Sequence, residues 1–107
     1  MELQFECDKQ DDGSARLKVI GDVTIHTSPK LREQLKPLLA EDIREVRVQL
    51  DEVEFMDSSG IATLVEGLQW SRASGGRFVL CGLHENVRDV LSLAKLDSVF
   101  DIEECAG

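Results

Sequence analysis

The sequence predicts an α/β fold: a mixed, mostly parallel sheet of about five strands, with about three helices packed on it and a β-hairpin at the N-terminus. Near the N-terminus, two segments of alternating apolar and polar residues flank a group of turn-forming residues, which is typical of a hairpin. Further along, segments with apolar residues at helical spacing alternate with short strand-like segments. Such alternation favours parallel strands joined by crossover helices.

The hairpin is predicted at the start of the chain. Apolar and polar residues alternate over residues 3–7, which indicates a half-buried strand. Residues 11–14, Asp-Asp-Gly-Ser, have the composition of a tight turn. The alternation resumes at residue 15, so we expect a second, antiparallel strand that runs through Gly21 towards Ile25.

The first helix is predicted to begin at Ser28-Pro29. Serine is a favoured N-cap residue, and proline suits the first helical position. Pro37 lacks a backbone donor and its ring clashes with the carbonyl four residues earlier, so we expect a kink or an early end there. The apolar face of this helix consists of Leu31, Leu35, Leu38 and Leu39.

The remaining elements follow in alternation. Residues 46–50 predict a third strand, and residues 78–81 form a continuous apolar run that is typical of a strand covered on both faces. The helix between these strands should end at Gly75-Gly76. Residues 87–94 predict a third helix, and residues 99–102 a short last strand. The apolar stripe of the second helix is Ile61, Leu64, Val65 and Leu68.

Size and charge limit the kinds of function. The chain has 107 residues, of which 42% are apolar, so we expect one domain over residues 1–107 that folds without a metal, a cofactor or a disulfide. The formal net charge is −9, from 21 acidic and 12 basic residues. Because an acidic surface repels phosphate groups, neither nucleic acid nor an anionic membrane is an expected partner.

The cysteines and the apolar runs indicate the compartment. The chain contains Cys7, Cys81 and Cys105 but no Cys-x-x-Cys sequence. Cys7 and Cys81 lie in strand-like segments, so we expect both to be buried as small apolar residues. This usage favours a reducing compartment, and we expect a cytoplasmic protein. Neither a signal peptide nor a run near the ~20 apolar residues that cross a membrane is visible in the sequence.

Residues 54–68, EFMDSSGIATLVEGL, are the most informative segment for function. An apolar stretch stops at Asp57-Ser58-Ser59-Gly60, and a helical pattern begins at once. Functional groups in open parallel sheets gather beyond the carboxyl ends of strands, and a helix N-terminus offers unpaired N–H groups and a positive dipole. Capping by Asp57 or Ser58 accounts for one polar residue. It accounts neither for the other polar residues nor for Gly60, a poor helix former.

The same turn suits phosphorylation. A phosphoserine carries about −1.5 to −2 charges and three acceptor oxygens, which would meet N–H donors and a favourable dipole at a helix start. The domain should then keep its shape. A partner docked over the turn would confront a bulky dianion and be released.

Two other functions compete with this interpretation. An esterase-like nucleophile elbow has the pattern Gly-x-Ser-x-Gly, but Asp57 and Ile61 occupy the two glycine positions around Ser59, and the histidines are His26 and His84. A receiver domain phosphorylated on aspartate needs acids after its first strand, whereas residues 11–12 lie in the hairpin turn. Trp70 also has two interpretations: an exposed interface anchor, or a ring that lies over a neighbouring helix.

Three segments resemble a known family. VIGDVTIHTSPKLREQL, VEFMDSSGIATLVEGL and GGRFVLCGLHENVRDVLSLAKLDSVFDI are similar to the STAS domain of bacterial anti-sigma factor antagonists, with a resemblance from about Leu17 to Ile102. The element order of that family agrees with the order predicted above. Members commonly end with another helix after the last strand, whereas this sequence stops at Gly107, so that helix is either absent or was cut away.

The resemblance implies a phosphorylation site and a binding surface. In that family, the serine just before the glycine of the Asp-Ser-Ser-Gly motif is the phosphoacceptor. This serine corresponds to Ser59, with Asp57, Ser58 and Gly60 around it. The loop before the first helix is expected to lie beside this turn. The partner-binding residues implied are Gly21, Asp22, Thr24, Thr27, Ser28 and Ile61.

The resemblance also implies partners. The unphosphorylated form would bind an anti-sigma factor that is also a GHKL-type serine kinase, and so free a sigma factor. A PP2C-type phosphatase would reverse the phosphorylation, and the protein would be a monomer or a weak homodimer without enzymatic activity. The alternative is a soluble STAS subunit that docks on the ATPase of an ABC-type lipid transporter. A scaffold in a large stress-sensing assembly is a further possibility.

Overall fold

The computed structural model describes residues 3–40 and 43–105. Within them, the order of strands and helices agrees with the prediction, and the predicted fold class is confirmed. No helix among the described residues has the length and apolarity needed to cross a membrane. The elements are β1 (Gln4–Lys9), β2 (Ser14–Ile20), α1 (Ser28–Ala40), β3 (Glu45–Glu52), α2 (Ser58–Ala73), β4 (Arg77–Cys81), α3 (Glu85–Leu93) and β5 (Asp101–Glu103).

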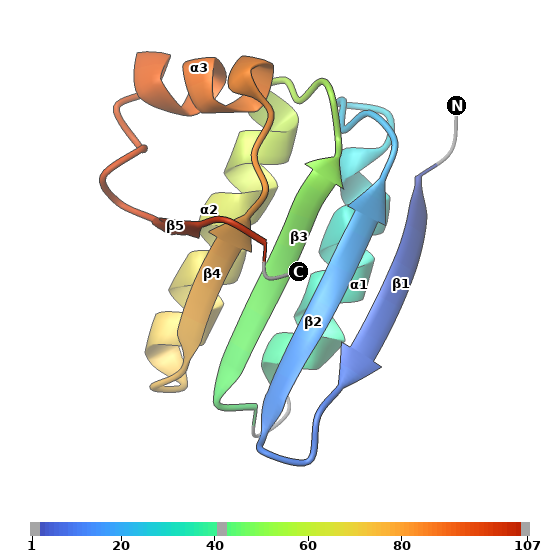
Figure 1. The fold of residues 1–107 in the computed structure, drawn as a ribbon, viewed down its shortest axis with the longest axis vertical. Coiled ribbons are helices and arrows are strands. Elements are labelled where there is room, and N and C mark those ends of the chain that lie inside the picture. Colours follow the sequence, from blue (N-terminus) through green and yellow to red (C-terminus); the bar gives the residue numbers. More distant parts are fainter. Residues whose placement is uncertain (1–2, 41–42, 106–107) are drawn as a thin grey trace.

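The strands form one five-stranded sheet in the order β1-β2-β3-β4-β5. The β1–β2 pair is antiparallel and the other three pairs are parallel, so the predicted hairpin is confirmed. Figure 1 shows α1 and α2 behind this sheet, and α3 at the end where β2, β3 and β4 finish. The loops that follow β2 and β3 therefore meet at the end of the sheet where these strands finish.

The core lies between the sheet and the two long helices. Gly67 of α2 shows how close these layers are, because a Cβ there would come within 2.9 Å of the Phe78 ring and 3.4 Å of Leu35 in α1. The four leucines predicted for the inner face of α1 are all buried. The buried strand residues of this layer are Ala15, Leu17, Val19, Val46, Val48, Leu50, Phe78 and Leu80.

The opposite face of the sheet carries a network of ion pairs. Arg77 contacts Glu45 at 2.9 Å, Asp101 at 3.3 Å and Glu103 at 2.9 Å. Arg47 contacts Glu103 at 2.8 Å. These charges connect β3, β4 and β5, so the short last strand is held by ion pairs as well as by backbone hydrogen bonds.

The prediction for Cys7 was wrong. Cys7 is exposed, whereas Cys81 is buried as expected. The register places Cys7 beside the buried Leu17, but β1 is an edge strand, and its residues after Phe5 are exposed. The alternation in the sequence marks the strand correctly, but at this edge it does not mark burial.

Of the two outcomes expected at Pro37, a kink or an early end, the early end was wrong, because α1 continues to Ala40. Proline in a helix costs about 3 kcal/mol, but burying one leucine side chain gains about 1.5–3 kcal/mol. Leu38 and Leu39 are both buried, and Pro37 is on the exposed side, where water can solvate the carbonyl left without a donor. The helix also begins one residue early, with Ser28 as its first residue.

Two strand boundaries differ from the prediction. β2 ends at Ile20, where Gly21 has a φ of +117°, a conformation that favours glycine, and pairing resumes only at a single bridge from Val23 to Met56. The last strand begins at Asp101 rather than at residue 99. The continuous run of residues 78–81 is fully buried, as expected for a strand covered on both faces.

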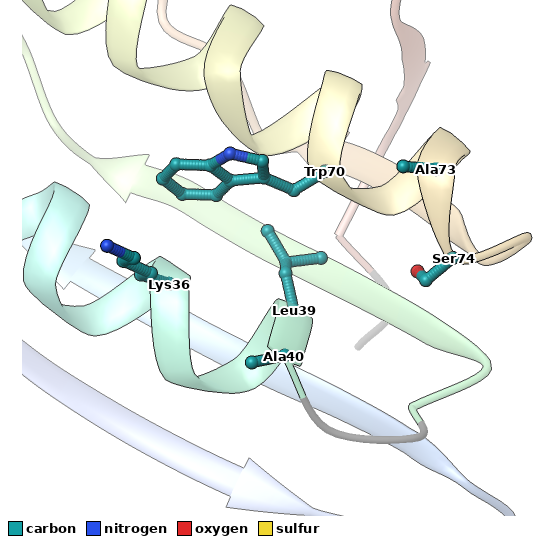
Figure 2. A pocket seen from close by; sticks show the side chains of 6 residues that line it. All are labelled: Lys36, Leu39, Ala40, Trp70, Ala73 and Ser74. Carbon is teal, nitrogen blue, oxygen red and sulfur yellow. The ribbon is translucent and has the colours of Figure 1, made fainter.

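The Trp70 ring lies over α1, which decides between its two interpretations (Figure 2). The Arg32 guanidinium lies 5.5 Å from the centre of this ring and also pairs with Glu66 at 3.2 Å. A shallow, largely apolar pocket of about 330 Å³ lies beside the ring, between the ends of α1 and α2. It is lined by Lys36, Leu39, Ala40, Trp70, Ala73 and Ser74.

Candidate functional site

Two loops meet at the end of the sheet where β2 and β3 finish. The Val23 N–H donates to the Phe55 carbonyl at 3.0 Å, and the Asp57 N–H donates to the Val23 carbonyl at 3.0 Å. These bonds form the parallel bridge between Val23 and Met56. The loop before α1 therefore lies beside the turn that opens α2, in the arrangement that the family resemblance implies.

Asp57 is the N-cap of α2. Its backbone is extended, with φ −91° and ψ −175°, and its Oδ1 accepts hydrogen bonds from the N–H groups of Ser59 at 2.9 Å and Gly60 at 3.4 Å. Its Oδ2 accepts a third bond from the Ile25 N–H at 3.1 Å. One carboxylate thus caps the helix and fixes the neighbouring loop, a link between distant residues that the sequence pattern could not indicate.

Ser58 and Ser59 are the first two residues of α2. Ser58 is exposed and Ser59 is half-buried, so neither hydroxyl-bearing residue is enclosed in the core. The Thr63 hydroxyl donates to the Ser59 carbonyl at 3.0 Å, which fixes the first turn of the helix. A phosphate on either serine would lie at the positive end of a 16-residue helix, where the helix dipole favours negative charge, although the Asp57 carboxylate already accepts from the N–H groups of Ser59 and Gly60.

Gly60 is required by packing. A Cβ at this position would come within 2.5 Å of Met56 Cγ and 2.8 Å of Val23 Cγ1, distances that real Cβ atoms do not show. The groups that approach this backbone closely are therefore side chains of the Val23–Met56 bridge. Gly60 lets the helix start against that bridge, and so places the two serines at the end of the sheet where β2 and β3 finish.

The loop before α1 is held by its own threonines. Thr27 Oγ1 accepts from the Thr24 N–H at 2.9 Å and donates to the Asp22 carbonyl at 2.9 Å. Gly21 donates to the Glu52 carbonyl at 3.1 Å. Asp22 is exposed and Thr24 half-buried, so both are at the surface.

Two other residues named from the resemblance are buried. Ser28 and Ile61 are 8% and 5% exposed, so they pack beneath the surface residues of this site and are not themselves accessible. Ser28 donates its N–H to the Thr24 carbonyl at 2.7 Å, which ends the loop against the first turn of α1.

Two exposed apolar residues belong to the paired loops beside the serine turn. The exposed fractions are 66% for Ile25 and 48% for Phe55, which is high for side chains of this size. Ile25 donates its N–H to Asp57, and Phe55 accepts from Val23, so both belong to the paired loops. The sequence reading assigned Ile25 to the end of a strand, and only its position beyond Gly21 could have signalled a loop.

Acidic residues lie next to these apolar ones. A pocket of about 400 Å³ lies beside the first loop and is lined partly by Asp22, Asp51, Glu52 and Glu54. His84 also lines it and bonds to the Asp51 carbonyl through Nε2 at 2.8 Å. The end of the sheet that carries the paired loops therefore presents apolar groups within a negatively charged surface.

Two groups that the competing mechanisms would use bond to other parts of the chain. The Nε2 of the His84 ring bonds to the Asp51 backbone carbonyl, not to a serine of the turn. Asp12 lies just before β2 begins, at the opposite end of that strand from the serine turn, where it accepts from Ser14. In the described part of the chain, no group of three or more His, Cys, Asp or Glu could hold a metal ion.

Comparison with known proteins gives a consistent family. The chain is 30% identical over 94 residues to the anti-sigma-B factor antagonist of Bacillus subtilis, covering 88% of this chain and 85% of that protein. It is 25% identical over 107 residues to the anti-sigma-B factor antagonist of Listeria monocytogenes, covering 100% and 94%.

A solved structure and a family model extend this likeness. The crystal structure of a Thermotoga maritima protein matches with a TM-score of 0.86 at 26% identity, covering 94% of this chain and 86% of that one. The model of the STAS domain matches residues 8–105, which include the whole sheet from β2 to β5 and all three helices. The chain belongs to the STAS domain family.

Proposed function

We propose that this protein is an anti-sigma factor antagonist that is switched off by phosphorylation of Ser59. The observation that carries this proposal is the position of the serines at the first turn of α2, beside the paired loops that carry the exposed Ile25 and Phe55. The relatives named anti-sigma-B factor antagonist support the same function.

The binding surface consists of the two paired loops and the start of α2. Ile25 and Phe55 supply apolar area that a partner can cover, and buried apolar anchors dominate the energy of most interfaces. Asp22 and Glu54 supply negative charge around them. This combination favours a partner with an apolar patch ringed by basic residues, because complementary charge speeds association and excludes wrong partners.

Phosphorylation would act on this surface and not on the fold. A dianion at the start of α2 lies at the positive end of the helix dipole, so the domain tolerates it. A partner that covers Ile25 and Phe55 would have to bury this charge, or place its own groups against it and against Asp57. Desolvating the phosphate and the nearby carboxylate costs binding energy, and the partner dissociates.

The partners follow from this function. The anti-sigma factor is a GHKL-type serine kinase that modifies Ser59, and a PP2C-type phosphatase removes the phosphate. The protein acts in the cytoplasm, as a monomer or weak homodimer, and catalyses no reaction itself. Gly21, Asp22, Thr24 and Thr27 shape the partner surface.

The test is phosphorylation with the cognate kinase and ATP, followed by mass spectrometry of the modified peptide. We expect one phosphate on Ser59 in the wild type and in Ser58→Ala, and none in Ser59→Ala. Ser59→Ala should still bind the kinase, whereas Ser59→Asp should bind at least tenfold more weakly. Labelling of another residue would refute the site assignment. Capture of an ABC-type ATPase in place of a kinase would favour the transporter-subunit alternative.

A further inference from the structure

A pair of cysteines lies on the face of the sheet that carries the ion pairs, away from α1 and α2. Cys81 is the last residue of β4 and is buried, and Cys105 follows β5 and is half-buried. The Gly82 N–H donates to the Glu103 carbonyl at 3.1 Å, which ties the two segments together just beyond the paired strands. In Figure 1 the chain after β5 turns back across the end of β4.

Gly82 makes the space for the Cys105 sulfur. A Cβ on Gly82 would come within 2.7 Å of Cys105 Sγ and 3.0 Å of Asp51 Cβ, and its φ of +72° is a conformation that favours glycine. The Cys105 sulfur therefore rests on the backbone of the residue next to Cys81. Burial, together with a hydrogen bond to the Cys105 thiol, raises the pKa of Cys81 to about 12.

We propose that Cys81 and Cys105 form a reversible disulfide that fastens the segment after β5 to the end of β4 when the protein meets an oxidised low-molecular-weight thiol. The thiolate of Cys105 attacks one sulfur of that small disulfide, and the first small thiolate leaves. Cys81 then attacks the Cys105 sulfur, and its proton passes to the second small thiolate as that thiolate leaves, while the first small thiolate takes up the proton that Cys105 lost to water. Two protein thiols are oxidised and one small disulfide is reduced to two thiols.

The environments of the two sulfurs assign these roles. Cys105 is the more accessible, so an external disulfide reaches it first. Cys81 is enclosed and holds its proton strongly, which makes it inert towards external reagents. Attack by Cys81 on the neighbouring mixed disulfide needs no access from solvent. The first step sets the sensitivity to oxidant, and the second gives a bond that a small reductant reaches through the half-buried Cys105 sulfur.

Cys7 is the competing partner and serves as the control. It is exposed, but its register partner is the buried Leu17, so its side chain is on the helix-covered face of the sheet, opposite to Cys105. In addition, β1 and β4 are separated by two strands, or roughly 14 Å at 4.7–4.9 Å per strand step. A disulfide requires Cα atoms within about 7 Å, so Cys7 cannot join Cys81 without rearrangement of the sheet.

The bond would close a loop that contains α3 and β5. Closing a loop of this length restricts the unfolded chain and raises the stability of the folded state. The effect is separate from the serine turn, so the proposal stands or falls independently of the proposed function.

The test uses the intact protein incubated with oxidised glutathione, alkylated with iodoacetamide and digested with trypsin. The three cysteines fall in different tryptic peptides, residues 1–9, 78–88 and 96–107. We expect the last two peptides joined by a disulfide and two hydrogen atoms lighter than their sum, in the wild type and in Cys7→Ser. Dithiothreitol should separate them.

Thermal unfolding supplies a second measurement. Oxidation should raise the midpoint by roughly 5 °C or more in the wild type and in Cys7→Ser, and should leave Cys105→Ser unchanged. A bond to peptide 1–9, a stable glutathione adduct on Cys105 without the second step, a disulfide-linked dimer, or three alkylated thiols after oxidation would each overturn the proposal.

Discussion

The carboxylate of Asp57 accepts a hydrogen bond from the backbone N–H of Ile25 across 3.1 Å, although 32 residues separate them in the sequence. The same carboxylate caps α2 through Ser59 and Gly60. The position of the exposed Ile25 side chain therefore depends on the residue that also positions the serines. A change at Asp57 should disturb the helix start and the neighbouring loop together.

Replacing Asp57 with alanine should lower the free energy of unfolding by about 2 kcal/mol. Loss of an N-cap side chain costs about 0.5–2 kcal/mol, and a hydrogen bond such as that from the Ile25 N–H contributes about 1 kcal/mol. Urea unfolding followed by the fluorescence of Trp70, the only tryptophan, measures this change.

Asp57→Asn is the matched control for this substitution. Asparagine is as good an N-cap as aspartate and keeps one acceptor oxygen, so it should retain the cap and lose the bond to the Ile25 N–H. We expect a cost about half that of alanine. Equal costs for the two variants would show that the charge, and not the cap, is what matters.

Replacing Gly60 with alanine should destabilise the domain by about 1–3 kcal/mol, because the new methyl group would overlap Met56 and Val23. The fold should adjust by moving the start of α2, so phosphorylation of Ser59 should also slow. Equilibrium unfolding and the initial rate of phosphate incorporation measure the two effects.

A double-mutant cycle with Met56→Ala distinguishes overlap from a general helix effect. Truncating Met56 removes the atoms nearest to the new methyl group, so Gly60→Ala should cost less in that background than in the wild type. Additive costs would contradict the packing explanation.

Stability should fall in acid partly through Glu103. Hydrogen bonds from Arg47 and Arg77 hold the pKa of the Glu103 carboxyl below its ordinary value of about 4.5. The folded state thus favours the charged carboxylate. The contribution of the Glu103 carboxylate to stability is complete above the pKa that this group has in the unfolded chain. It is lost as the pH falls through the lower pKa of the folded state.

The variant Glu103→Gln isolates this contribution. We expect the Glu103→Gln variant to have a lower free energy of unfolding than the wild type at pH 7. This difference should narrow as the pH falls below about 4.5. High salt should narrow it at pH 7 as well, because the ion pairs are partly exposed. Glu104→Gln, the same charge change at the exposed neighbouring position, should show neither dependence. A gap that is constant between pH 3 and 7 would be the contradicting outcome.

The order of elements could be predicted from the sequence because each element has a strong local signal. Period-two alternation marks β2 and β3, and leucines at helical spacing mark α1. The serine turn could also be located, since a strand signal and a helix signal meet there. These features depend on residues close together in the chain.

Burial at the sheet edge and contacts between loops could not be predicted in this way. Whether Cys7 is covered depends on how far the helices extend over the edge strand, and the Ile25–Asp57 bond depends on which strands become neighbours. Pro37 shows the same limit, because local backbone preference was outweighed by burial of the leucines that follow it. The errors at Cys7 and Pro37 therefore concern packing between distant segments, which a local pattern does not report.

The partner surface should depend on Ile25 and Phe55 more than on any other exposed apolar residue. Replacing either with serine should weaken binding of the cognate anti-sigma factor about tenfold or more, because truncating a central apolar anchor costs upwards of about 1–2 kcal/mol. Stability should change by about 0.5 kcal/mol or less, since both side chains are exposed in the free protein.

Leu93→Ser is the matched control for these two substitutions. Leu93 is 86% exposed but lies at the end of α3, outside the paired loops. Titration calorimetry with the anti-sigma factor should give the wild-type affinity for this variant and reduced affinity for Ile25→Ser and Phe55→Ser. If Leu93→Ser weakened binding as much as the other two, the partner would have to cover α3 as well. The serine turn would then lie at the margin of the interface, where a phosphate could not by itself release the partner.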